Sequence, residues 1–221
     1  MKRWKGLIVL TLFSFTLGIT TVAANEMGID DFSKTKVGDF PLWWSTYPFQ
    51  GGKVKQVYKM KEEDGKRFIS AFDNKDISLP IYKDFPWDLQ KYPVLKWRWR
   101  ATTLPKGAAE NSRATNDSAC GVYVPFGKTS GVALKYVWSS TLAVGNVWEK
   151  DPKEFFVIVK SSGAAKLNQW QEVSVNVLEE FKKHFGKNPS KNPSAVGIMT
   201  DGNAMHSASG CDYGDFRISG E

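Results

Sequence analysis

The chain has little of the residue types from which small cross-linked domains and metal centres are built. Its 221 residues include 2 cysteines and 2 histidines. Two cysteines exclude a disulfide-dense miniprotein and a multi-cysteine zinc site, and two histidines argue against a histidine-based metal centre. The G-x-S-x-G and H-E-x-x-H hydrolase motifs are also missing. Beyond the first apolar segment, no run approaches the roughly 20 apolar residues needed to span a bilayer.

Aromatic residues, glycine and proline are plentiful by contrast. Hydrophobic residues make up 42% and charged residues 24%, which is typical of a globular chain and not of a disordered one. The aromatic fraction is 14%, with 9 Trp, so rings can fill a core and still be available to a ligand. The 19 Gly and 10 Pro favour a turn-rich β protein over a helical bundle.

The first 24 residues have the pattern of a secretory signal peptide. Lys2, Arg3 and Lys5 form a positive head, residues 6–19 carry no charge, and residues 22–24 are small enough for a cleavage site. The alternative is a retained membrane anchor. We therefore expect residues 1–24 to be a signal, residues 25–221 to form a single domain, and the protein to be exported to the periplasm or secreted, with no membrane attachment after cleavage.

The charge of the remaining chain is too small for a nucleic-acid-binding protein. The formal net charge is +7, but three of the cations lie in the positive head, which leaves +4. A bias of this size is not the electrostatic footprint of nucleic-acid binding. The two cysteines, Cys120 and Cys211, both lie after the signal. In an oxidising compartment they can form a disulfide, and the alternative of two buried thiols in neighbouring strands stays open.

Short strand-like runs separated by turn residues recur along the chain. They cover residues 53–60, 67–72, 77–82, 94–100, 117–126, 134–138, 155–161, 170–177, 195–201 and 213–219. The run 94–100 is the most informative, because apolar and cationic residues alternate and successive side chains of a strand point to opposite faces. Its apolar face is expected in the core, and its cationic face needs water, carboxylates or an anionic ligand. The two faces are Leu95, Trp97 and Trp99 against Lys96, Arg98 and Arg100.

One amphipathic helix is predicted after residue 176. Asn176 can cap it with Glu179 three residues on, Phe181 and Phe185 lie on one stripe, and Gly186 is placed to end it. Many short strands and a single short helix predict an all-β fold, an antiparallel β-sandwich.

Charged and tyrosine side chains at strand ends and in late loops form the candidate site. If the strands stack as a sandwich, they either make a salt-bridge network or line a polar ligand groove in which rings stack on a sugar. The candidate ligand-binding residues are Arg98, Arg100, Asp117, Tyr123, Asp201, Tyr213 and Asp215. A glycosidase would instead need two carboxylates about 5–10 Å apart. These would come from Asp117, Glu172, Asp201 and Asp215.

Several stretches, in order, resemble a bacterial family of secreted proteins, domain of unknown function 3047. They are residues 92–100, 116–119, 122–124, 136–138, 157–163, 168–170, 185–186, 196–201 and 213–216. The resemblance covers about residues 30–218 and implies no activity. Residues 29–32 and 214–216 are also similar to galactose-binding-like jelly rolls, a fold used by many carbohydrate-binding modules. Some of those modules hold a structural calcium, which this similarity would place at Asp31 and Asp215; no other cofactor is expected.

Three functions follow as hypotheses. The first is a non-catalytic binding module for a saccharide or cell-envelope glycan, suggested by the export signal, the aromatic surplus and the Arg/Asp/Tyr cluster. The second is a glycan hydrolase that uses two of the four carboxylates. The third is an envelope assembly partner that uses Trp43, Trp44 or Trp87 as contact anchors, with ordinary packing as the alternative for these rings.

Overall fold

The computed structural model describes residue 1 and residues 25–128, 130–151 and 154–220. The expected signal, residues 1–24, therefore lies outside the described residues apart from residue 1. Within the described part, no helix is long and apolar enough to cross a membrane.

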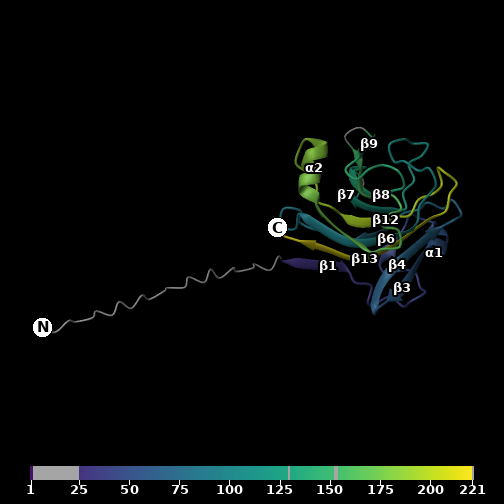
Figure 1. Cartoon of the computed structure of the whole chain (residues 1–221), viewed down its shortest axis with the longest axis horizontal. Coiled ribbons are helices and arrows are strands. Elements are labelled where there is room, and N and C mark those ends of the chain that lie inside the picture. The colour runs from purple at the N-terminus through teal and green to yellow at the C-terminus, as the bar shows by residue number, and fades with distance from the viewer. Residues whose placement is uncertain (2–24, 129, 152–153, 221) are drawn as a thin grey trace.

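Two β-sheets stacked face to face form the molecule (Figure 1). Sheet A has the strand order β11-β6-β13-β4-β3, and β1 also pairs with β13. Its strands are β1 (Glu26–Asp30), β3 (Tyr58–Glu63), β4 (Lys66–Asp73), β6 (Val94–Thr103), β11 (Gln171–Asn176) and β13 (Ser209–Ser219). Sheet B has the order β2-β5-β12-β7-β8-β10-β9. Its strands are β2 (Trp44–Ser45), β5 (Ile81–Asp84), β7 (Cys120–Pro125), β8 (Ala133–Ser139), β9 (Val147–Asp151), β10 (Phe155–Ser162) and β12 (Ala195–Met199).

The predicted β-sandwich is confirmed, and the chain passes repeatedly from one sheet to the other, as in jelly rolls. One detail of the prediction is wrong, because β8 and β10 pair in parallel and sheet B is therefore mixed. The hairpin strand β9 lies between them in sequence and pairs antiparallel with β10 at the sheet edge. A parallel pair needs such a crossover segment, whereas an antiparallel pair needs only a tight turn.

The strand β6 has the two faces that its alternation predicts. Leu95, Trp97 and Trp99 are at most 2% exposed, whereas the cationic residues between them are half-buried. The indoles pack across the sandwich onto β8, with 5.6 Å between the ring centroids of Trp97 and Tyr136. The core therefore lies between β6 of sheet A and β8 of sheet B.

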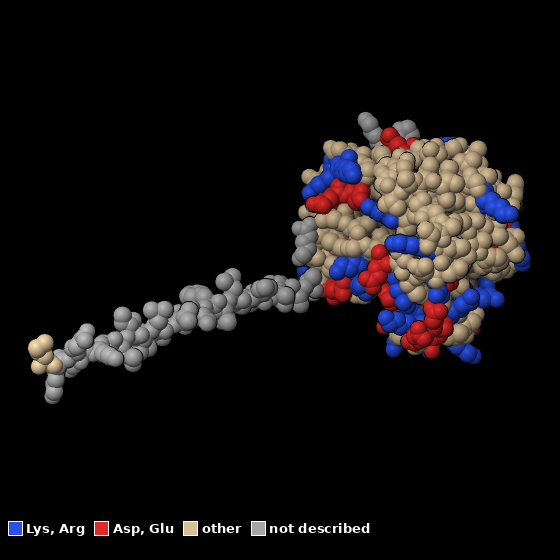
Figure 2. All heavy atoms as spheres, viewed as in Figure 1, with Lys and Arg blue, Asp and Glu red and all other residues tan. Residues whose placement is uncertain are grey.

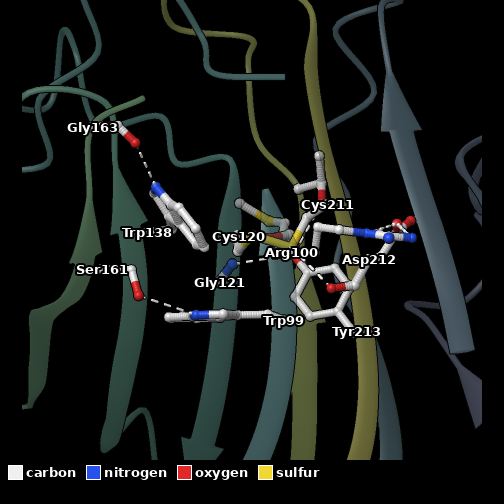
Figure 3. Close-up of a disulfide and its surroundings, with 12 residues drawn as sticks. Trp99, Arg100, Cys120, Gly121, Trp138, Ser161, Gly163, Cys211, Asp212 and Tyr213 are labelled. Atoms are coloured by element: carbon white, nitrogen blue, oxygen red, sulfur yellow. Dashed lines mark hydrogen bonds and ion pairs between the residues drawn. A yellow bond between two sulfur atoms is a disulfide. The ribbon is translucent and has the colours of Figure 1, made fainter. Parts of the chain in front are cut away.

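A disulfide joins the two sheets inside this core (Figure 3). It links Cys120 of β7 to Cys211 of β13, with a Cα–Cα distance of 5.4 Å, and both residues are fully buried. Of the two alternatives left open by the sequence, the structure has the disulfide. The bond ties sheet B to sheet A close to Trp99 and Tyr213.

The predicted helix is present as α2 (Val177–Phe185). The Asn176 side chain accepts a hydrogen bond from Glu179 N at 3.0 Å, and Gly186 ends the helix in the left-handed conformation. A second helix, α1 (Gly51–Val57), occupies part of the run 53–60 that was expected to be a strand. That prediction is wrong because Val54 and Val57, three residues apart, are both buried, which suits a helical turn.

Candidate functional site

The guanidinium groups of Arg98 and Arg100 lie on the outer face of sheet A and are neutralised there. Arg98 Nε is 2.7 Å from Asp215 Oδ2, and Arg100 is 2.8 Å from Asp212 and 2.9 Å from Glu63. Figure 3 shows Trp99 and Arg100 leaving β6 in opposite directions, the ring toward the core and the guanidinium toward Asp212. Every cation of this pair thus has an acidic partner within the protein.

Trp170 covers both guanidinium groups. Its ring centroid is 4.2 Å from Cζ of Arg98 and 4.6 Å from Cζ of Arg100, and its Nε1 donates a hydrogen bond of 3.0 Å to Glu63. Hydrogen bonds from Trp170 and Arg100 lower the pKa of the Glu63 carboxyl. Figure 2 likewise shows basic and acidic side chains side by side over β3 and β4. This geometry corresponds to the salt-bridge network that the sequence offered as one alternative.

Tyr213 points into the core and joins the two sheets there. Its hydroxyl accepts a hydrogen bond of 3.1 Å from Gly121 N and donates one of 2.8 Å to Met199 O (Figure 3 shows the contact with Gly121). The side chain is fully buried, and burial raises the pKa of its hydroxyl. Tyr213 is therefore placed as a structural residue beneath sheet B and does not reach a ligand.

Asp117 and Asp201 lie close together at one end of sheet B. The two oxygens of Asp117 accept hydrogen bonds from Ala204 N at 3.1 Å and Met205 N at 2.7 Å, which fixes the loop after β12. Asp201 is 5% exposed, and its Oδ1 accepts no hydrogen bond from the described residues. Burial raises the pKa of Asp201 to about 6; Lys135 opposes this rise and Asp117 adds to it.

The seven predicted ligand-binding residues therefore do not form one groove. Three lie on the outer face of sheet A, one in the core, and three on sheet B. The expectation is wrong because Trp99 on β6 and Val122 on β7 both point inward, so their neighbours Arg98 and Tyr123 point to opposite outer faces of the sandwich. Arg98, Arg100 and Asp215 lie on the outer face of sheet A, and Tyr213 lies in the core. Asp117, Tyr123 and Asp201 lie on sheet B.

The proposed calcium ligands do not come together as an oxygen-rich site. Asp31 Oδ1 accepts a hydrogen bond of 2.9 Å from Ser33 N, which lowers the pKa of the carboxyl, and Asp215 is paired with Arg98. Among the residues that the structure describes, no three or more His, Cys, Asp or Glu side chains are grouped so that they could hold a metal. The arrangement does not fit the expected calcium site.

Of the hydrolase candidates, only Asp117 and Asp201 are neighbours. Asp117 is fully buried with both oxygens bonded to the loop, and Asp215 faces Arg98 on sheet A. Glu172 lies opposite Arg98 in the register of β11 and β6, and it lines a cavity of about 440 Å³ between β10 and β11. None of the other three candidates lines that cavity.

Of the three suggested contact anchors, two belong to the core. Trp44 and Trp87 are each 5% exposed, whereas Trp43 is 65% exposed. Trp43 lines a cavity of about 570 Å³ together with Lys55 and Lys59, at the edge of the sandwich. Of the three rings, only Trp43 is therefore exposed enough to contact a partner.

A row of partly exposed aromatic rings crosses the outer face of sheet B. Tyr47 and Tyr82 have ring centroids 6.4 Å apart, Tyr82 and Tyr123 6.3 Å, and Tyr123 and Phe155 6.1 Å. On β12, between Tyr82 and Tyr123, Gly197 supplies the space, since an added Cβ there would lie 2.4 Å from the Tyr82 ring. We call these four rings, Tyr47, Tyr82, Tyr123 and Phe155, the aromatic row.

Lys135, Lys150 and the carboxylate of Asp201 lie at the Phe155 end of the aromatic row. Lys135 Nζ is 5.2 Å from the Tyr123 ring centroid, and Lys150 Nζ is 5.4 Å from that of Phe155. Lys135 is only 5% exposed, as is Asp201. Tyr123 and Asp201 were predicted as site residues from the sequence, whereas the other residues of this face were not. The missed signal was a single lysine at 135 between apolar strand residues.

The fold and this face define a β-sandwich protein with an aromatic and charged outer surface on one sheet. A family model described as "Protein of unknown function (DUF3047)" matches residues 43–217, and the chain belongs to that family, as its sequence predicted. No curated protein matches the chain.

Solved structures with a similar fold include sugar-binding and sugar-cleaving proteins. One is a family 11 carbohydrate-binding module from Clostridium thermocellum in complex with a mixed-linked β-1,3-1,4 tetrasaccharide. It has 9% sequence identity and a TM-score of 0.45, covering 90% of this chain and 98% of that one. Another is endoglucanase Cel12A from Rhodothermus marinus, with 11% identity and a TM-score of 0.44, covering 73% of this chain and 85% of that one.

Proposed function

We propose that this protein is an exported, non-catalytic module that binds a saccharide on the outer face of sheet B. The observation that carries the proposal is the aromatic row together with the buried polar groups at its end. Saccharide sites combine aromatic surface with a few fixed polar groups that set the orientation of the ligand. Here the rings supply the surface, and Asp201 Oδ1 is a buried acceptor that no described residue satisfies.

The position of the rings favours this face over the other. Tyr82, Tyr123 and Phe155 come from three different strands of one sheet, with Tyr47 following β2, and all four remain at least partly exposed. Neighbouring rings are inclined to one another by 59°, 64° and 21° along the row, and a row of this kind can contact several sugar units. The opposite face offers Trp170, but its ring already stacks on Arg98 and Arg100.

The described geometry gives no support for hydrolysis. Two carboxyl groups must flank the scissile bond at about 5–10 Å, with water able to reach them. Asp117 and Asp201 are neighbours, but both are buried and Asp117 is held by two backbone amides. We therefore keep binding without cleavage as the proposed function.

The test compares two exposed aromatic residues on different faces. Tyr47 is 53% exposed in the aromatic row, and Phe72 is 47% exposed on β4 of sheet A. The purified protein is screened by affinity electrophoresis against soluble polysaccharides, and hits are measured by calorimetry. Tyr47→Ala should weaken binding roughly 5- to 30-fold, a loss of about 1–2 kcal/mol for one stacked ring. Phe72→Ala should leave binding unchanged.

Two results would contradict the proposal. One is that no polysaccharide retards the wild-type protein. The other is that Phe72→Ala weakens binding as much as Tyr47→Ala, which would place the ligand elsewhere.

A further inference from the structure

We propose that the ligand is an acidic saccharide, whose carboxylate or sulfate group binds between Lys135 and Lys150 while its sugar rings lie along Tyr82 and Tyr47. This inference rests on the proposed function and names the chemical class of its ligand. It follows from the different chemistry of the two ends of the aromatic row.

At the Tyr47 end, no Lys or Arg of the described residues lies over a ring of the row. The two tyrosines contact each other, and Tyr82 also contacts Tyr123. At the other end, an ammonium group lies over each ring, Lys135 over Tyr123 and Lys150 over Phe155. A neutral sugar stacked on these two rings would have to displace both lysines. A negatively charged group would instead meet two cations, each over one of two rings whose centroids are 6.1 Å apart.

Lys135 is the unusual member of the pair. It is 5% exposed, yet within the described part of the chain its Nζ makes no hydrogen bond and no ion pair. Its side chain lies over Gly121, where an added Cβ would be 3.0 Å from Lys135 Cε. The side chain is buried along its length, and the ammonium group at its end remains accessible to solvent or to a ligand. Packing therefore holds the lysine in place; Asp201 acts on it electrostatically, but no described carboxylate forms a direct ion pair with it.

The surrounding charges leave an excess of cations at this end. Arg113 is 2.9 Å from Asp151 Oδ1, so that pair is neutral overall. Burial lowers the pKa of Lys150, and the like charge of Lys135 lowers it further, whereas Asp151 and Asp201 raise it. Among the described residues, Asp151 and Asp201 act on Lys150, and Asp151 is already paired with Arg113. The oxygens of Asp117 are bonded to the loop after β12.

The experiment uses pairs of polymers that differ only in charge. Polygalacturonate is compared with its carboxyl-reduced form, and dextran sulfate with dextran, by calorimetry on the full chain at pH 7.5. We expect the charged member of at least one pair to bind tenfold or more tightly than its neutral partner. Which pair responds distinguishes a carboxylate from a sulfate. Added salt should weaken the charged interaction.

Three variants locate the charged group. Lys135→Met keeps the length of the side chain and should lower affinity for the charged polymer about tenfold or more, which corresponds to the loss of one charge-assisted hydrogen bond. Lys150→Gln should act in the same direction. Lys66→Met removes an exposed cation from β4 of sheet A and should change nothing. Thermal melting of each variant confirms that it is folded.

The outcomes separate this inference from the proposed function. If charged and neutral members bind equally, or if Lys135→Met binds the charged polymer as wild type does, the inference is overturned while saccharide binding stands. If no polymer binds, or if a polymer binds and Tyr47→Ala does not weaken its binding, the proposed function fails. Preferential binding of a charged member that is lost in Lys135→Met supports both.

Discussion

Replacing Asp201 by asparagine should stabilise the protein at neutral pH, because this carboxylate is buried without full compensation. Asp201 is 5% exposed, and its Oδ1 accepts no hydrogen bond from the described residues. Its pKa is raised from 3.8 to about 6 in the folded protein. Well below pH 3.8 the group is protonated in both states and costs nothing. Between about pH 4 and 6 the unfolded chain loses this proton while the folded protein still holds it, so stability falls until the folded group also ionises near pH 6. The rise in pKa corresponds to about 3 kcal/mol.

The assay is urea unfolding followed by tryptophan fluorescence at pH 7.5 and at pH 4. Asp201→Asn should raise the free energy of unfolding by up to about 3 kcal/mol at pH 7.5, and the gain should largely disappear at pH 4. Asp215→Asn is the matched control, because it removes an ion pair with Arg98 and should give no gain at pH 7.5. A variant that is no more stable than wild type at pH 7.5, or a gain of equal size at both pH values, would refute the reasoning.

Two further predictions concern the core and the candidate site. Replacing both Cys120 and Cys211 by alanine removes a cross-link between residues 91 apart and should lower the free energy of unfolding by about 4–5 kcal/mol, measured by urea unfolding without reductant; a loss below about 1 kcal/mol would contradict it. Gly197→Ala places a Cβ 2.4 Å from the Tyr82 ring, so it should cost about 1–3 kcal/mol and also weaken saccharide binding in calorimetry. Unchanged binding in a folded Gly197→Ala protein would show that Tyr82 is not part of the site.

Features that depend on neighbouring residues were predictable from the sequence. The alternation around Arg98 placed its cations opposite the indoles because side-chain direction in a strand is set residue by residue. The cap at Asn176 and the end at Gly186 were predictable for the same reason, since each depends on backbone within one turn of the helix. The sandwich followed from the number of such strands and the near absence of helix.

Features that depend on distant pairing were not predictable. The sequence cannot tell which of two stacked sheets a strand joins, so Arg98 and Tyr123 looked equally able to share a groove although they lie on opposite outer faces. The same ambiguity hid Lys150 and Phe155, whose strands β9 and β10 reach the site only through the parallel pairing of β10 with β8. Val54 and Val57 misled for a local reason, because in a segment as short as 53–60 the spacing of a few apolar residues does not separate a helical turn from a strand.

The two outer faces differ in how the protein satisfies its cations, and this difference separates structure from function. On sheet A, Arg98 and Arg100 have acidic partners at 2.7–2.9 Å and a covering indole, so each of these charges has a direct partner of opposite sign. On sheet B, Lys135 is more deeply buried than either arginine; a ring lies beside it and Asp201 acts on it electrostatically, but no described carboxylate forms a direct ion pair with it. A cation without a direct partner in the protein is available to pair with a charge on another molecule. A search for the ligand should therefore start from the face whose charge is left unpaired, although the sequence directs attention first to the arginines.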